Sequence, residues 1–327
     1  RLFAVAGVLA AAANLAPIGT DSFGVWLLAR FATGFFLGGV YPPAMHVISG
    51  WYREGRGLAL GIVVGALTLG SGSPHLLRSA LSGDWRVSMA SASALTLFGA
   101  AVMWLAVRDG PFRSVPAVVR PSEFWRAVSG RGSLLALGGY LGHMWELYAM
   151  WAWLPVFLAA VYMDVEVPLL GLSAGSLAGF AVFALGSASC VVAGALSERF
   201  GRTMVTSVAM VVSGSAALVI GFVPASVVLV SVIAVVWSAT VVADSAQFSA
   251  AMTELTDERY RGSALAFQTG SGFLLTAVTI RAVPMLEGEF GWGVAFAVLA
   301  LGPVFGVASM VALRRSPEAR LLAGGRG

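Results

Sequence analysis

Apolar runs of membrane-spanning length follow one another along almost the whole of this sequence. They cover residues 2–19, 23–50, 57–81, 86–107, 133–161, 169–197, 203–222, 225–252, 263–285 and 292–313. A helix needs about 20 residues to cross a ~30 Å hydrocarbon core. Backbone groups in lipid must be hydrogen-bonded within the protein, which leaves helices or closed barrels, and the alternating pattern of barrel strands is missing. The sequence therefore predicts an all-α polytopic membrane protein with ten spans.

The composition supports burial in lipid and offers no constellation for an enzyme. Apolar residues make up 58% of the 327 residues and charged residues 11%, whereas soluble domains carry about 25% charged residues. The single cysteine, Cys190, lies inside an apolar run, so we expect a buried packing residue and no disulfide within the chain. The three histidines are scattered and no phosphate loop is present. No catalytic activity, metal or cofactor is expected.

The arginines predict the orientation, because cationic loops are retained in the cytoplasm. An even number of spans places both ends of the chain on one side. Placing that side in the cytoplasm puts most of the arginines there, namely Arg1, Arg53, Arg56, Arg108, Arg113, Arg120, Arg126, Arg131, Arg199, Arg202, Arg259, Arg261, Arg314, Arg315, Arg320 and Arg326. We predict a multi-pass protein of a bacterial-type inner (plasma) membrane with both ends cytoplasmic. The pI of 9.7 then reflects arginine facing anionic lipid, and no nucleic-acid partner is expected.

A polar interval at residues 108–132 divides the chain into unequal parts. It reads as a central cytoplasmic linker between a bundle of four spans at 1–107 and a bundle of six spans at 133–313, with a cytoplasmic tail at 314–327. Residues 122–126 within the linker suit either a short helix on the membrane surface or a solvated connection.

The two parts share a repeat at an offset of 205 residues. The segment Arg56-Gly57-Leu58-Ala59-Leu60 falls on Arg261-Gly262-Ser263-Ala264-Leu265. Parallel repeats of this kind are typical of transporters built from two bundles around a central site. Two matching bundles would hold six spans each, so we expect two further spans to belong before Arg1.

Several motifs are similar to those of the major facilitator superfamily. In that family the hinge between the second and third helices of each half reads G-x-L-x-D/E-R-x-G-R, and its fourth helix carries R-x-x-x-G-x-x-x-G. The first is matched by Gly194, Leu196, Glu198, Arg199, Gly201 and Arg202, and the second by Arg30, Gly34 and Gly38. The phrase from His143 to Pro155 resembles the nitrate/nitrite and cyanate permease-like branch. The resemblance implies a two-bundle fold with ten of the twelve transmembrane helices present, the first two lacking.

Glu146 is the strongest candidate for proton coupling. A carboxyl at membrane depth is costly to keep charged, so a functional role and proton uptake near neutral pH are expected. His143 lies one turn earlier, and the alternative is a Glu-His contact that only fixes helix packing. Trp145 and Tyr148 flank Glu146 in sequence and are candidates to line a substrate cavity, although such aromatic residues also face lipid and interfaces.

Four polar residues in other spans are candidates for contact with substrate or for gating. Arg30 suits bidentate binding of an anion or neutralisation of a carboxylate, with a structural bond to a helix end as the alternative. Asp244, with Gln247 close to its face, suits substrate binding or an inner gate. Gln268 suits hydrogen bonding to a ligand, although such residues also join helices at ~0.6 kcal/mol per bond.

The hinge and four glycines are predicted to govern conformational change. We expect Glu198, Arg199 and Arg202 to form charge-assisted contacts with neighbouring helix ends that hold the outward-facing state. The hinge residues are Gly194, Glu198, Arg199, Gly201 and Arg202, and the glycines expected at close helix contacts are Gly34, Gly38, Gly61 and Gly65.

These features together predict a secondary active transporter that moves a small organic or inorganic anion by alternating access, coupled to protons. The partners would be a small-molecule solute, protons and the lipid bilayer, and the protein would be a monomer. One alternative is a proton-driven antiporter that exports a hydrophobic or cationic compound. The residues Gly61, Gly65, Gly70, Gly72 and Pro74 resemble the antiporter pattern, but Ser73 replaces its last glycine. A transport-inactive membrane sensor is an alternative of another class.

Overall fold

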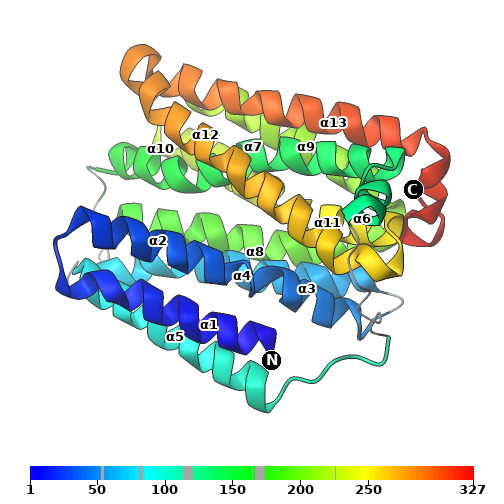
Figure 1. Ribbon diagram of the computed structural model, residues 1–327. Coiled ribbons are helices and arrows are strands. Elements are labelled where there is room, and N and C mark those ends of the chain that lie inside the picture. The colour runs from blue at the N-terminus through cyan, green and yellow to red at the C-terminus, as the bar shows by residue number, and fades with distance from the viewer. Residues whose placement is uncertain (53–54, 81–83, 113–120, 164, 166–173, 225) are drawn as a thin grey trace. The chain divides into compact units, whose positions relative to one another are not determined.

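The computed structural model describes residues 1–327 except 53–54, 81–83, 113–120, 164, 166–173 and 225 (Figure 1). The predicted side assignments of Arg53, Arg113 and Arg120 fall on residues outside this description. In chain order the helices are α1 (Leu2–Leu15), α2 (Phe23–Leu37), α3 (Tyr41–Ser49), α4 (Arg56–Ala80), α5 (Trp85–Leu105), α6 (Pro121–Val128), α7 (Arg131–Val161), α8 (Ala174–Phe200), α9 (Arg202–Ile220), α10 (Val227–Ala243), α11 (Ser245–Leu255), α12 (Arg261–Ala297) and α13 (Leu301–Arg314). Short 3-10 turns are η1 (Ala16–Gly19), η2 (Glu258–Tyr260), η3 (Val298–Ala300) and η4 (Pro317–Gly324).

The described residues contain helices and no strands, which confirms the all-α prediction. Nine helical stretches among them are long and apolar enough to cross a membrane, and the last of these, Glu258–Arg314, holds 57 residues. At 1.5 Å per residue a straight helix of that length would measure about 85 Å, far more than a bilayer core needs. The chain turns back at Gly291, whose φ of 77° suits glycine, so this stretch makes two crossings (Figure 1). The nine stretches thus account for the ten predicted spans.

The repeat detected in the sequence coincides with the starts of two helices. α4 begins at Arg56 and α12 begins at Arg261, 205 residues later. Trp85 opens α5, and Trp292 follows the turn at Gly291. The repeated segments therefore occupy the same position, the first turn of a long helix.

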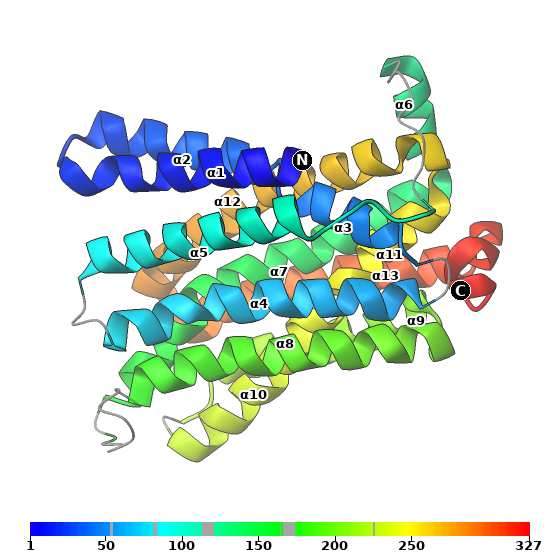
Figure 2. The same cartoon turned by 90° about the horizontal axis from the view of Figure 1, so that it is seen from below.

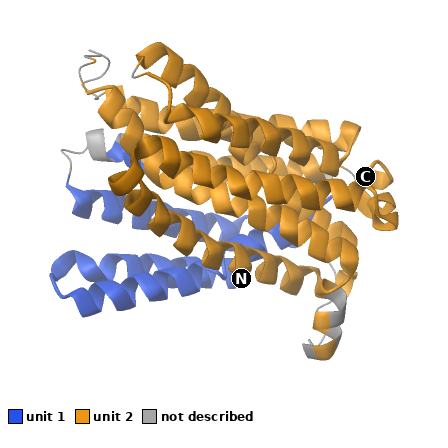
Figure 3. Cartoon of the chain, turned by 90° about the horizontal axis from the view of Figure 1, so that it is seen from above, with its two compact units in different colours: residues 1–53, 74–114 blue, residues 54–73, 115–327 orange. Residues whose placement is uncertain are grey.

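Two compact units divide the chain: unit 1 holds Arg1–Arg53 and Pro74–Ser114, and unit 2 holds Glu54–Ser73 and Val115–Gly327 (Figure 3). Within unit 1, α1 packs against both α2 and α5. A Cβ on Gly7 would lie 3.3 Å from the Ala100 Cβ, and the Asn14 side-chain amide donates to the Ser93 hydroxyl at 2.9 Å. Close backbone approach and a polar bond thus join the helices of unit 1.

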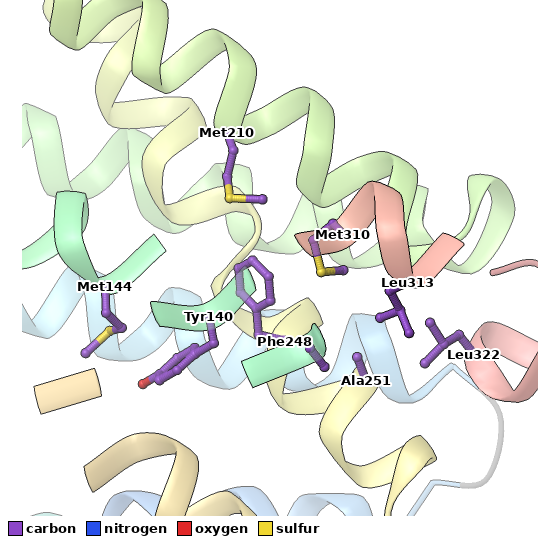
Figure 4. Packing of buried hydrophobic residues seen from close by; sticks show 9 residues of the cluster. Tyr140, Met144, Met210, Phe248, Ala251, Met310, Leu313 and Leu322 are labelled. Atoms are coloured by element: carbon purple, nitrogen blue, oxygen red, sulfur yellow. The ribbon is translucent and has the colours of Figure 1, made fainter. Parts of the chain in front are cut away.

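Unit 2 is built around α7, which packs against α8, α10, α11, α12 and α13. A Cβ on Gly142 would lie 2.4 Å from the Gly302 carbonyl oxygen, so only glycine permits the approach of α7 to α13. An apolar cluster fills the region where α7, α9, α11, α13 and η4 meet (Figure 4), formed by Ala136, Tyr140, Met144, Met210, Phe248, Ala251, Met310, Leu313 and Leu322. This core holds α11 in the interior of unit 2.

The first part of α4 belongs to unit 2 because it lies along α8 (Figure 2). Cβ atoms on Gly61 and Gly65 would lie 2.6 Å from the Cys190 carbonyl oxygen and 2.8 Å from that of Ser187. A Cβ on Gly194 would lie 2.7 Å from the Gly57 carbonyl oxygen. The compact units therefore do not follow the bundle boundaries expected near residues 107 and 132.

The two other predicted packing glycines do not make helix contacts. A Cβ on Gly34 would meet no described atom within 4 Å, and one on Gly38 would meet the carbonyl oxygen of Phe35 in its own helix. Instead, a Cβ on Gly39 would lie 2.7 Å from the Ala6 Cβ. The helix ends at Gly38 and α3 starts at Tyr41, so the turn between them places a different glycine against α1 than the helical spacing indicated.

The linker and the C-terminal tail both carry ordered structure. α6 covers the segment for which a short helix was one of two alternatives, and Trp125 packs on Phe267 of α12 with ring centroids 5.4 Å apart. Residues 317–324 form η4 rather than a free tail, with Leu322 buried in the apolar cluster. Burial of such a side chain contributes about 1.5–3 kcal/mol, which holds the C-terminal segment on unit 2.

Candidate functional site

Glu146 lies in the interior of unit 2, bonded to two neighbouring helices. Its side chain comes from α7 and is 1% exposed. The Ser213 hydroxyl on α9 donates to Oε2 at 2.8 Å, and the Trp237 indole N–H on α10 donates to Oε1 at 2.7 Å. Both carboxyl oxygens therefore have a donor, which is how a polar group inside an apolar bundle is tolerated. A change in the protonation of Glu146 therefore alters the bonds that join α7 to α9 and α10.

His143 lies one turn before Glu146 and joins a second buried group. Its Nδ1 atom is 2.8 Å from Asp244 Oδ1, and its Nε2 atom is 2.7 Å from the Ser245 hydroxyl. The His143 and Asp244 side chains are 2% and 1% exposed. No described donor is aligned for a hydrogen bond to either Asp244 oxygen, so the His143 ring is the close partner of this carboxylate.

Asp244 occupies a break in a membrane-spanning helix. α10 ends at Ala243 and α11 begins at Ser245, so Asp244 follows one helix and precedes the other. Discontinuous helices place unpaired backbone groups and helix ends at membrane depth, where transporters bind ions and substrates. The break thus adds a polar position beside His143 in an otherwise apolar stretch.

Arg202 is the centre of a third group, here called the Arg202 network, at the end of α8 and the start of α9. The guanidinium is 1% exposed. It donates to both carboxylate oxygens of Glu254 at 2.9 and 2.7 Å, an arrangement that favours arginine over lysine. It also donates to Gln247 Oε1 at 2.9 Å, to the Ser197 hydroxyl at 3.1 Å and to Glu198 Oε1 at 3.1 Å.

Glu198 connects this network to α4. Its Oε1 atom accepts the backbone N–H of Gly57 at 2.7 Å, in the first turn of α4. An acidic side chain at a helix N-terminus satisfies an unpaired N–H and complements the positive end of the helix dipole. The hinge thus contacts a neighbouring helix end through Glu198, to which Arg202 donates. That these contacts hold the outward-facing state stays a prediction.

The C-terminal segment packs directly on the hinge. The Thr203 hydroxyl donates to the Gly327 carbonyl oxygen at 2.7 Å, and the Arg326 guanidinium donates to the Glu198 carbonyl. Gly201 has a φ of +89°, and a Cβ there would lie 2.3 Å from the Gly327 carbonyl oxygen. Glycine at this hinge position is therefore required by both backbone conformation and contact.

Several predicted site residues lie elsewhere. Arg199 is exposed and lies over the Phe200 ring at 5.3 Å, with no described bond to the Arg202 network. The Trp145 indole donates to the Val298 carbonyl at 3.1 Å, whereas Tyr148 packs on Phe273 of α12 at 5.1 Å. Trp145 and Tyr148 therefore do not enclose Glu146 together.

The remaining candidates make structural bonds. The Gln268 side-chain amide donates to the Phe248 carbonyl at 3.3 Å, which ties α12 to α11, while its Oε1 atom is buried without a described partner. In unit 1 the exposed Arg30 guanidinium donates to Asn14 Oδ1 at 2.6 Å and lies over the Trp26 ring at 5.7 Å.

The partners missed from the sequence include Ser213, Trp237 and Glu254. Trp237 was discoverable as an indole in the middle of an aliphatic run, where its N–H needs an acceptor. Glu254 was discoverable as a carboxylate near the arginine-rich end of a span. The polarity of these residues was visible, but their pairing with Glu146 and Arg202 was not.

A bundle of membrane-spanning helices with buried acidic groups and a charged hinge defines a helical membrane transporter. The Major Facilitator Superfamily model matches residues 1–247. The chain belongs to this superfamily and is a multi-pass secondary transporter, not an enzyme.

Solved structures support the fold. The E. coli fucose:proton symporter FucP superposes with a TM-score of 0.68 at 14% identity, over 96% of this chain and 82% of its own. The human organic anion transporter MFSD10 (TETRAN) superposes with a TM-score of 0.63 at 15% identity, over 94% of this chain and 76% of its own. No curated protein sequence matches the chain. At these identities the likeness concerns the fold.

Proposed function

We propose that this protein couples the transport of a small anion to protons and that Glu146 binds the coupling proton. The observation that carries the proposal is the Glu146 carboxyl group, buried at membrane depth and bonded to both α9 and α10. Acidic groups in such positions are costly and are retained for ion or proton pathways. The fucose:proton symporter with a similar fold is a precedent for proton coupling in this architecture.

The contacts of Glu146 allow it to gain a proton without losing its partners. Ser213 donates to the carboxylate, but its hydroxyl also lies 3.3 Å from the Met210 carbonyl oxygen. When Glu146 is protonated, the Ser213 hydroxyl donates to the Met210 carbonyl oxygen instead. Its oxygen then accepts a hydrogen bond from the carboxyl O–H of Glu146. The Trp237 N–H only donates and stays with the other oxygen. Protonation thus rearranges the bond to α9 while the bond to α10 persists.

Arg30 supports an anionic substrate. Its guanidinium is exposed within unit 1, and its described hydrogen bonds use Nη2 alone, toward Asn14. The other N–H groups suit carboxylate or a similar planar anion. The structural likeness to an organic anion transporter agrees with an anionic substrate. The predicted resemblance to nitrate/nitrite and cyanate permeases, the inner-membrane location and the monomeric state remain predictions.

A second candidate function is export of a cationic compound. It is favoured by the two buried carboxyl groups of unit 2, Glu146 and Asp244, which suit a positive ligand. The anionic assignment is preferred because the described hydrogen bonds of Arg30 use Nη2 alone, which leaves Nε and Nη1 to bind an anion.

Transport of protons by reconstituted protein tests the proposal. Liposomes loaded with a pH-sensitive dye receive a panel of nitrate, cyanate and short carboxylates, and then of organic cations. We expect an anion to carry protons inward, and Glu146→Gln to abolish proton-driven accumulation while exchange of labelled anion persists. Ser215→Ala, an exposed change on α9 that affects a bond to its own helix, is the matched control. Undiminished proton-driven accumulation in Glu146→Gln would refute the role of Glu146, and proton flux with cations alone would favour export.

A further inference from the structure

We infer that the His143–Asp244 pair is a second proton-binding site and that α11 transmits its protonation to the Arg202 network, releasing Glu198 from the start of α4. The inference deepens the proposed function, since it assumes a transport cycle that uses protons. It does not require Glu146 to be the coupling residue, and its test separates the two.

α11 joins the pair to the network by residues near both of its ends. Asp244, at its start, faces His143 of α7. Gln247, less than one turn on, and Glu254, near its end, both accept hydrogen bonds from Arg202 of α9. These positions are spaced by three and seven residues, so they lie on one face of the helix. Asp244 and Glu254 are about 15 Å apart along the axis, and a short regular helix moves as a unit.

The surroundings of α11 favour movement as a rigid body. Residues 245–253 are all buried, and Phe248 and Ala251 form part of the apolar cluster. In the proposed change, α11 turns about Asp244, the one residue between it and α10. Packed elements of this kind move between discrete arrangements and do not deform continuously.

The proposed change reaches α4 through the contact between Glu198 of α8 and the Gly57 N–H. Gln247 holds Arg202 Nη1, and Arg202 Nη2 holds the same Glu198 Oε1 that accepts the Gly57 N–H. If α11 shifts, Gln247 and Glu254 withdraw from Arg202 together. Glu198 is then the ion-pair partner that remains to Arg202, and the guanidinium draws this carboxylate away from the Gly57 N–H that it caps.

The proton count explains why the pair is a switch. With one proton between them, His143 and Asp244 form either an ion pair or a neutral pair, both of zero net charge. A second proton gives a cationic ring beside a neutral acid, so the attraction across 2.8 Å is lost. If the ring was neutral before, both ring nitrogens become donors and the Ser245 hydroxyl must turn to accept from Nε2, whereas in the ion pair it accepts already. In both cases the contact between His143 and Asp244 at the start of α11 weakens.

Other titratable groups act on this pair from each side. Glu146 of α7 lies close enough to Asp244 for two carboxylate charges to repel, the neutral Cys190 thiol of α8 donates to the Val242 carbonyl at 3.3 Å, and α12 presents the neutral Gln268 near Phe248. At the far end of α11 the charges are those of the Arg202 network, in which two carboxylates face one guanidinium. A pH response can thus arise from Glu146 as well, and the experiment must distinguish the two sources.

A buried cysteine at the network reports its opening. Ser197 is 0% exposed and lies beneath Arg202, so Ser197→Cys in a Cys190→Ala background gives one protected thiol. Its labelling rate with a maleimide is measured in proteoliposomes between about pH 5.5 and 8. Ala195→Cys, an exposed position on the same helix, corrects for the titration of the thiol itself.

We expect the corrected labelling rate to rise several-fold on acidification. Asp244→Asn should remove this rise, as should His143→Gln. Gln247→Leu should reduce it, because this change removes one bond between α11 and Arg202 and leaves those of Glu254. Thr253→Val, a buried change on α11 that affects a bond to its own helix, should preserve it. Each variant is used after its thermal unfolding shows that it is folded.

The inference is overturned if the rise survives in folded Asp244→Asn and His143→Gln, or if Glu146→Gln alone removes it. If Glu146→Gln fails to affect proton-driven transport but the rise still depends on Asp244, the role of Glu146 falls and the present inference stands.

Discussion

Replacement of Arg202 by methionine is the sharpest test of what holds the hinge together. Methionine has a similar length and no charge, so the change removes the five hydrogen bonds of the guanidinium with little loss of volume. Removing one partner of a buried ion pair costs about 3–5 kcal/mol, because the remaining charge stays unpaired.

The exposure of the residues that Arg202 binds narrows the expected loss of stability. Glu254 and Glu198 are 15% and 30% exposed, so water recovers part of their solvation. Gln247 is fully buried and loses the donor to its Oε1 atom, which costs about 1–3 kcal/mol. We therefore expect Arg202→Met to lower the free energy of unfolding by roughly 3–4 kcal/mol, and the apparent Tm by about 6–8 °C at ~2 °C per kcal/mol.

Thermal unfolding can be followed through the exposure of Cys190. It is the single cysteine and is 0% exposed, so its reaction with a fluorogenic maleimide follows thermal unfolding in mild detergent. Arg199→Met is the matched control, since this exposed neighbour lies outside the Arg202 network and should change stability by less than about 0.5 kcal/mol. Arg202→Met combined with Glu254→Leu should recover part of the loss. Equal Tm values for the Arg202 and Arg199 variants would refute the reasoning.

Two further predictions concern helix packing and the C-terminal segment. Gly61→Ala should destabilise the protein by about 1–3 kcal/mol and impair transport, because its Cβ would lie 2.6 Å from a backbone oxygen of α8. The control Gly70→Ala should be tolerated, since its Cβ would meet no described atom within 4 Å. Equal stability of the two variants would contradict this prediction. Hydrogen bonds from its own backbone N–H and from Ser316, with Arg131 nearby, lower the pKa of Glu318 below its ordinary value. The local order that these bonds give to the start of η4 is then fully present above the unfolded pKa of about 4.3 and is lost as the pH falls through the lower folded value. A spin label attached through Leu321→Cys in a Cys190→Ala background should become mobile near about pH 3 and stay immobile at about pH 6; equal mobility at both would show that Glu318 does not anchor the segment.

The sequence alone predicted the number of membrane-spanning stretches and their limits to within several residues, but not the breaks that separate α2 from α3 and α10 from α11. Hydrocarbon thickness fixes the length of a span, and the cost of bare backbone groups in lipid leaves few folds open. The repeat between residues 56–60 and 261–265 anticipated the starts of α4 and α12 for the same reason, since each opens a span. Glu146 stood out because a carboxyl within an apolar run is costly wherever the helix faces.

The tertiary structure decided which residues meet. Trp237 lies 91 residues from Glu146, and Glu254 lies 52 residues from Arg202, yet each completes the bonding of its partner. Helical spacing predicted contacts at Gly34, but the structure uses Gly39. In a soluble protein the apolar stripe of a helix shows which side is buried. Within a membrane both lipid and the bundle interior are apolar, so hydropathy does not report how a helix is rotated, and the pairing of polar groups depends on packing alone.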